Sequence, residues 1–136
     1  MAQASAASGL MVGIVVRDLE AMTPFYQAVI GVDEFREFRP SNGLIRLFAC
    51  GEGFVKVMQL DEPPTTSNPP GGNEGGSTGL RWFTFTRDDI EGVVERALAA
   101  GAKVAHPLQE YRPGARYAIL EDPEGNCWVE ILERLT

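Results

Sequence analysis

The sequence predicts an α+β fold in which two tandem βαβββ modules form a curved mixed sheet around a cleft. Two observations predict it. Apolar stretches of strand and helix length occur in the same order before and after a Pro- and Gly-rich stretch at residues 61–78. Short sequence patterns also recur in the two halves at one common offset. A length of 136 residues suits one domain, or two small repeats that share a core.

Composition and charge exclude several classes of protein. The chain carries 12 Lys and Arg against 19 Asp and Glu, a net charge of -7, and an acidic protein repels the phosphates of nucleic acids. No apolar run approaches the roughly 18 residues of a membrane span, so we expect no membrane partner. The count of 1 histidine excludes any site with two His ligands. Cys50 and Cys127 lack disulfide or metal spacing, so we expect two free thiols and a cytoplasmic location.

The first half is predicted to contain a strand, a helix and three strands. An apolar run at residues 10–16 predicts a buried strand, and apolar residues at helical spacing predict a helix that Gly31 ends. Because proline is unfavourable inside a helix, we place the helix start at Thr23 as N-cap, with Pro24 in the first helical position. Turn signals separate the three further strands, at residues 34–39, 44–49 and 54–60.

The second half is predicted to repeat this order. Residues 80–86 form a strand, and Asp88 or Asp89 caps a helix over residues 90–100. The strands that follow are expected at residues 103–105, 117–120 and 127–132. Between the first two of these strands we expect a loop with a solvent-facing His106.

The repeats divide the chain into a flexible tail, two modules and a linker. Asp18-Leu19-Glu20 recurs as Asp89-Ile90-Glu91, and Val57–Leu60 recurs as Trp128–Ile131, at the same offset. The linker is too polar to form a core, so it is either a module boundary or a functional flap. The tail, first module, linker and second module are expected at residues 1–8, 9–62, 61–78 and 79–134.

Three segments carry a resemblance to a known family. They are VVRDLEAMTPFYQAVIGV at residues 15–32, GLRWFTFTRDDIEGVVERALAAGAKV at 79–104 and YAILEDPEGNCWVEILE at 117–133. With its Phe-Tyr pair in the first helix and its Asp-Pro-x-Gly-Asn turn at 122–126, the chain resembles the vicinal oxygen chelate superfamily, which includes glyoxalases, bleomycin-resistance proteins and extradiol dioxygenases. The resemblance covers about residues 10–134 and implies the fold given above. It also implies a homodimer, often with modules exchanged between chains.

The resemblance implies four positions for metal ligands, on the first and fourth strand of each module. In this sequence they are Met11, Gln59, Trp82 and Glu130. Only Glu130 is a good ligand for a divalent ion, because Met11 offers a thioether, Gln59 a neutral amide and Trp82 no donor. We therefore expect no metal cofactor, and a largely apolar pocket that retains one carboxylate.

Strand alternation supports the same cleft. In the last strand Val129 and Ile131 face the core, which directs Trp128 and Glu130 toward the cleft. An open alternative is that Lys56 and Met58, instead of Gln59, face it. The expected ligand-binding residues are Met11, Gln59, Trp82, Thr84, Trp128, Arg116 and Tyr117, the last two from a segment with Tyr111 and Arg112 that flanks a Pro-Gly turn.

These features predict a protein that binds a small aromatic molecule without a metal, with Trp82 stacking on the ligand. The alternative is a glyoxalase-like lyase, isomerase or cyclising enzyme in which Glu130 acts as general base or as a residual metal ligand. A third possibility is that Glu130 has no function and pairs with Arg46 or Arg116.

Overall fold

The computed structural model describes residues 5–134 and confirms the α+β fold with two tandem modules. The first sheet has the strand order β1-β4-β3-β2 and the second has the order β5-β8-β7-β6. In each sheet the first and last strands of the module pair in parallel, and the other neighbours are antiparallel. The elements are β1 (Met11–Val16), α1 (Leu19–Ile30), β2 (Arg36–Phe38), β3 (Gly43–Cys50), β4 (Gly53–Leu60), β5 (Trp82–Arg87), α2 (Ile90–Ala99), β6 (Lys103–Arg112), β7 (Ala115–Glu121) and β8 (Trp128–Glu133).

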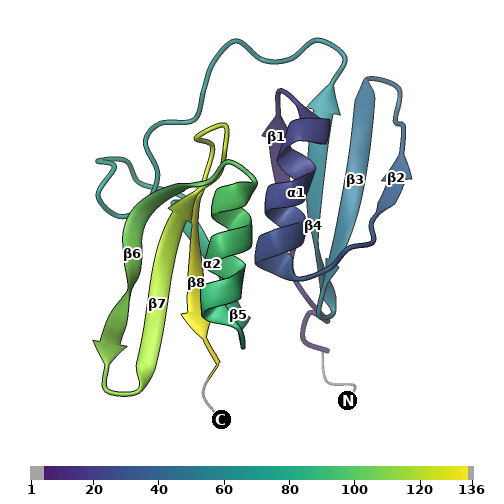
Figure 1. Cartoon of the computed structure of the whole chain (residues 1–136). Coiled ribbons are helices and arrows are strands. Elements are labelled where there is room, and N and C mark those ends of the chain that lie inside the picture. The colour runs from purple at the N-terminus through teal and green to yellow at the C-terminus, as the bar shows by residue number, and fades with distance from the viewer. Residues whose placement is uncertain (1–4, 135–136) are drawn as a thin grey trace.

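Both helices cover the same side of the two sheets and pack against each other at the centre of the molecule (Figure 1). One continuous core of buried side chains fills the space between helices and sheets, with contributions from both modules. We call the opposite side of the two sheets the open face. Neither helix of the described residues is long and apolar enough to cross a membrane.

The start of α1 corrects the predicted cap. Asp18, not Thr23, is the N-cap, and its side chain accepts a hydrogen bond from Ala21 N at 3.0 Å. Pro24 lies inside the helix, where it cannot donate a hydrogen bond to the Glu20 carbonyl of the first turn. The earlier start buries Leu19 completely, and this burial favours the longer helix.

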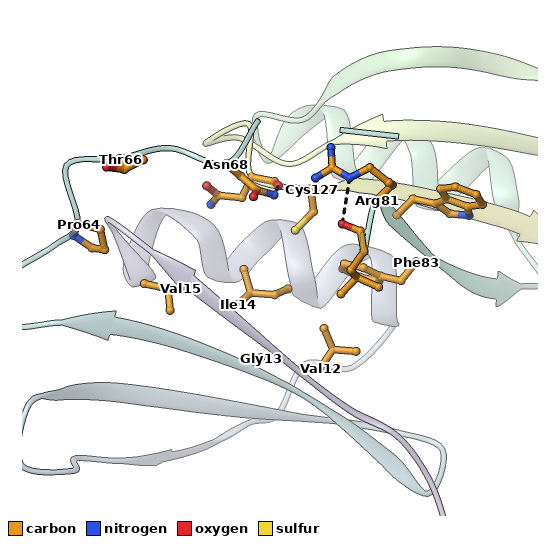
Figure 2. A pocket seen from close by; sticks show the side chains of 13 residues that line it. Val12, Gly13, Ile14, Val15, Pro64, Thr66, Asn68, Arg81, Phe83 and Cys127 are labelled. Carbon is orange, nitrogen blue, oxygen red and sulfur yellow. Dashed lines mark hydrogen bonds between the residues drawn. The ribbon is translucent and has the colours of Figure 1, made fainter. Parts of the chain in front are cut away.

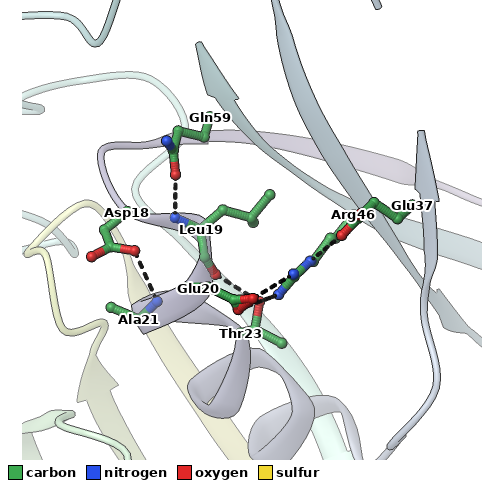
Figure 3. A network of polar contacts seen from close by, with 8 residues as sticks. All are labelled: Asp18, Leu19, Glu20, Ala21, Thr23, Glu37, Arg46 and Gln59. Carbon is green, nitrogen blue, oxygen red and sulfur yellow. Dashed lines mark hydrogen bonds and ion pairs between the residues drawn. The ribbon is translucent and has the colours of Figure 1, made fainter. Parts of the chain in front are cut away.

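A buried arginine joins this first turn to the sheet (Figure 3). Arg46 donates to Glu20 and Glu37, each at 2.8 Å, and to Thr23 Oγ1 at 2.9 Å. The hydrogen bond and charge of Arg46 lower the pKa of the Glu20 carboxyl. Arg46 therefore has its own partners on the helix side and does not pair with Glu130.

The second module binds both ends of α1. At the N-terminus, the Glu124 carboxylate accepts hydrogen bonds from Arg17 N at 2.8 Å and from Asp18 N at 2.8 Å. At the C-terminus, Arg87 donates to the carbonyls of Ala28 at 2.8 Å and Val29 at 3.0 Å. An anion at the N-terminus and a cation at the C-terminus both stabilise the helix dipole.

Gly31 makes the second of these contacts possible. It ends α1 with a φ of 85°, in the left-handed region. A Cβ at this position would lie 2.6 Å from the Arg87 guanidinium carbon. Glycine is thus required both for the backbone conformation and for the approach of Arg87.

A buried polar pair also crosses between the modules. Tyr26 on α1 donates its hydroxyl hydrogen to Asp122 at 3.1 Å, and both side chains are fully buried. Burial raises the pKa of Asp122 and of Tyr26. The backbone N–H groups of Glu124 and Asn126 donate to the other Asp122 oxygen, so this carboxyl group has partners on both sides.

Two further strand predictions were wrong in length. Strand β2 is shorter than residues 34–39, and β6 extends through Arg112 instead of ending at residue 105. His106 therefore lies in a strand and not in a loop. The pairing register between β6 and β7 shifts on both sides of His106. Such irregularities allow β6, an edge strand, to contain Pro107.

We expect Glu124→Gln to weaken the attachment of α1 to the second module. The neutral amide keeps the shape of the side chain but loses the charge at the helix N-terminus, so unfolding free energy should fall by about 1 kcal/mol. Urea unfolding followed by circular dichroism measures the change. Glu95→Gln is the control, because Glu95 is an exposed carboxylate on α2. Equal stability of the two variants would contradict this role of Glu124.

Candidate functional site

The two sheets meet at a cavity between β1 and β5, with a volume of about 340 Å³. Its walls come from both strands, from the linker that follows β4, and from the turn before β8 (Figure 2). We call it the seam cavity. Its lining residues are Val12, Gly13, Ile14, Val15, Pro64, Thr66, Asn68, Leu80, Arg81, Trp82, Phe83, Asn126 and Cys127.

The edges of the two sheets create this space. Strand β1 pairs with β4 and β5 pairs with β8, which makes β1 and β5 the edge strands that face the cavity. Gly13 on β1 widens the space, because a Cβ placed there would meet no atom within 4 Å. Strand alternation places Gly13 on the cleft side with Met11 and Val15, as the sequence predicts, although Gly13 is not among the predicted binding residues.

The linker covers the seam cavity and is tied down along its length. The Asn68 side-chain amide donates to the Asn126 carbonyl at 2.7 Å, and Arg17 donates to Ser67 Oγ at 3.0 Å. Arg81 donates to the Pro70 carbonyl at 2.6 Å. The segment is therefore both a connection between modules and a wall of the cavity.

Trp128 supports the linker instead of facing free space. Gly71 and Gly72 are buried against its indole ring, and a Cβ at Gly72 would overlap that ring. The His106 imidazole contacts the same indole edge-on, at 5.6 Å between centroids, and lies 2.8 Å from a Glu74 oxygen. Trp128 is on the predicted open face, but the linker occupies the surface on which a ligand was expected.

Gln59 lies on the wrong side of its sheet for the predicted role. Its side-chain oxygen accepts a hydrogen bond from Leu19 N at 2.7 Å, on the helix side. The ladders pair Gly13 with Lys56 and Thr84 with Glu130, so Lys56 is the counterpart of Glu130 in the first module. The common offset between the two sequence repeats correctly relates residues of β1 to their structural counterparts in β5. It does not relate residues of β4 to their structural counterparts in β8. A shift by an odd number of residues moves side chains to the opposite face.

Arg116 is also on the helix side. It donates to Glu91 at 2.7 Å and to Glu133 at 2.7 Å, and its hydrogen bond to Glu133 lowers the pKa of that carboxyl. Tyr117 is its neighbour on the open face, where it contacts Tyr111 edge-on at 6.1 Å between centroids. Neither Arg116 nor Tyr117 lines the seam cavity, so the structure does not bring them to Trp82.

Glu130 is on the open face, as strand alternation predicts. Its carboxylate accepts a hydrogen bond from Thr84 Oγ1 at 2.8 Å. Met11, the predicted first-strand residue, is on the same face and is 51% exposed, which leaves its thioether available to solvent. Of the predicted binding residues, only Trp82 both lies on this face and lines the seam cavity.

The side chains at these positions do not fit a divalent metal ion. In residues 5–134 no three His, Cys, Asp or Glu side chains come close enough to share one. The four implied positions contribute one carboxylate, and the structural counterpart of that carboxylate in the first module is the cation Lys56. Divalent ions need several oxygen, nitrogen or thiolate donors, and one carboxylate with an ammonium group at the equivalent position does not supply them.

Cys127 contributes a thiol to the cavity wall. Burial, and to a lesser degree the charge of Asp122, raises its pKa to about 12. Burial also raises the pKa of Cys50. A thiol with such a pKa remains protonated at neutral pH, so Cys127 acts as an apolar wall and not as a nucleophile.

Comparison with known proteins agrees with the fold. A family model described as "Glyoxalase/Bleomycin resistance protein/Dioxygenase superfamily" matches residues 10–130. The chain belongs to this superfamily. The uncharacterized protein YwbC of Bacillus subtilis is 27% identical over 125 residues, which cover 90% of this chain and 94% of YwbC. An uncharacterized protein of Mycobacterium bovis is 30% identical over 120 residues, which cover 85% of this chain and 76% of that protein.

Solved structures of this superfamily share the architecture over almost the whole chain. The glyoxalase family protein from Bacillus cereus matches with a TM-score of 0.72 at 19% identity, covering 100% of this chain and 99% of that chain. The genomically encoded fosfomycin resistance protein FosX from Listeria monocytogenes matches with a TM-score of 0.64 at 17% identity, covering 98% and 96%. At these identities the match establishes the fold alone.

We expect Cys127 to resist alkylation in the folded protein. A pKa of about 12 lowers its thiolate fraction about a thousandfold relative to an ordinary cysteine, so iodoacetamide at pH 8 should modify Cys50 first. Mass spectrometry of the two cysteine peptides over time measures both rates. In urea, where both thiols are exposed, the rates should become equal. Modification of Cys127 as fast as Cys50 in the folded state would contradict the assignment.

Proposed function

We propose that this protein binds a small planar organic molecule in the seam cavity, without a metal ion. The observation that carries the proposal is the cavity itself. Its volume of about 340 Å³ is in the range of small-molecule sites, and its walls combine aliphatic and aromatic side chains with a few polar groups. Trp82 borders it and is 45% exposed, so an aromatic ligand entering from the open face would contact the indole first.

Polar groups are placed to orient such a ligand. Thr66 and Asn68 contribute from the linker, and Asn126 contributes from the turn before β8. The apolar side of the cavity comes mainly from β1, through Val12 and Ile14. An apolar wall opposite a few hydrogen-bonding groups gives affinity through burial and specificity through the polar contacts.

The absence of a metal requirement is part of the proposal. Its support is the donor set, in which Glu130 is the one good ligand among the implied positions and bonds to Thr84. Glu130 also lies outside the cavity lining, so ligand binding does not depend on it. Glu130→Gln should therefore leave the affinity for a cavity ligand unchanged.

A thermal-shift screen with planar bicyclic compounds tests binding and the metal question together. Ligands that bind the folded state should raise the melting temperature by mass action, and EDTA should change neither the melting temperature nor the ligand effect. Elemental analysis of protein purified without added metal is the second measurement. One equivalent of a bound transition metal, or a loss of ligand effect in EDTA, would overturn the metal-free proposal.

Filling the cavity from β1 should block binding. Gly13→Leu places a side chain in the open space, and the Gly13 backbone does not have a positive φ, so a leucine introduces no backbone strain. We expect the affinity for a bicyclic ligand to fall about tenfold or more, with little change in melting temperature. Ala99→Leu adds the same side chain at an exposed position of α2 and is the control. Unchanged affinity in Gly13→Leu would show that ligands bind elsewhere.

A further inference from the structure

One charged side chain lines the seam cavity. Among its lining residues, all within the described part of the chain, Arg81 is the only one that is ionised at neutral pH. The cavity therefore carries a local positive charge in a protein whose net charge is -7. The net charge of the chain alone would favour a cationic ligand, whereas the charge inside the cavity favours an anionic one. At contact distance the charge inside the cavity dominates, because solvent and salt screen the distant charges.

The positive charge of Arg81 is not neutralised by the protein. Its Nε donates to the Leu80 carbonyl at 3.2 Å, and its Nη1 donates to the Pro70 carbonyl at 2.6 Å. Both partners are uncharged main-chain oxygens, and no carboxylate in residues 5–134 lies within ion-pair distance of Arg81. These two bonds fix the orientation of the guanidinium plane while using only part of its five N–H donors.

The cavity is divided into a polar side and an apolar side. In the view of Figure 2, the polar side chains of Arg81 and Asn68 lie along one side, and Val12 and Ile14 of β1 lie along the other. The charge of Arg81 also reaches Cys127, where it acts against the larger effect of burial on the pKa of the thiol. A ligand in this space meets an aliphatic surface on one side and a cation on the other.

We infer that the seam cavity takes an aromatic carboxylate, with its ring between β1 and Trp82 and its carboxylate on Arg81. This inference rests on the proposed function and specifies its ligand class. A planar carboxylate matches the planar guanidinium, and a charge-assisted hydrogen bond in a partly desolvated site is stronger than a neutral one. A cation in the same position would face Arg81 and be repelled.

Three probes of the same shape test this ligand class. Naphthoate, naphthamide and naphthylmethylammonium share one ring system and differ in the charge of the substituent. Isothermal titration calorimetry of the whole chain should show naphthoate binding about tenfold more tightly than naphthamide, with naphthylmethylammonium weakest. Raising the salt concentration should narrow the difference between acid and amide, because screening weakens the charged contact.

Two variants separate charge from linker anchoring. Arg81→Gln should abolish the preference for naphthoate over naphthamide, whereas Arg81→Lys should retain part of it because the charge remains. Arg81 also holds the linker at Pro70, so a control must loosen the linker without changing the cavity charge. Glu74→Ala does so, because it removes the side chain that ties the linker to His106, and Glu74 does not line the cavity.

The outcomes distinguish this inference from the function on which it rests. If none of the three probes binds the unmodified protein, the proposed function itself fails. If all three bind equally, or if naphthylmethylammonium binds best, the cavity still binds planar molecules but the carboxylate assignment is overturned. Equal loss of the naphthoate preference in Glu74→Ala and Arg81→Gln would also overturn it, because linker movement would then explain the effect.

Discussion

The attachment of α1 to the second module is the interaction on which the rest of the structure depends. Glu124 binds the main chain at the start of the helix, Arg87 binds the carbonyls at its end, and the buried Tyr26–Asp122 pair crosses between them. The first module provides none of these three partner groups. Because α1 has no basic residue in its own last turn, the cation that complements its dipole comes from β5.

This attachment places the edges of the two sheets opposite each other and leaves the seam cavity between them. Strand β1 directly precedes α1 in the chain, so fixing the helix also restricts the position of Val12 and Gly13 relative to Trp82. The turn that carries Asp122 and Glu124 continues into Asn126 and Cys127, which line the cavity. Residues 122–127 thus include both groups that hold the modules together and groups that line the proposed binding site.

Much of the fold could be predicted because alternation along a strand is a local property. The period of two correctly placed Val129 and Ile131 in the core and Glu130 on the open face. The prediction failed for Gln59, which was matched to Glu130 by the offset between the repeats. The pairing of β1 with β4 depends on the lengths of the connections between them, and sequence similarity between the modules does not fix these lengths. Trp128 was correctly placed on its strand, but its cover by Gly71 and Gly72 follows from the path of the linker.

The sequence by itself determined the α+β class and the two modules, because these depend on periodicity and repetition. Only the tertiary structure decided which groups share a cavity. Arg81 lies beside a polar linker in the sequence and had no periodic or motif signal, yet it becomes the charge of the seam cavity through bonds to two main-chain carbonyls. The contacts of Arg81 join segments whose relative position depends on the attachment of α1 to the second module and on the placement of the sheet edges β1 and β5. These two features depend on residues far apart in the sequence, so they are not local properties of the chain.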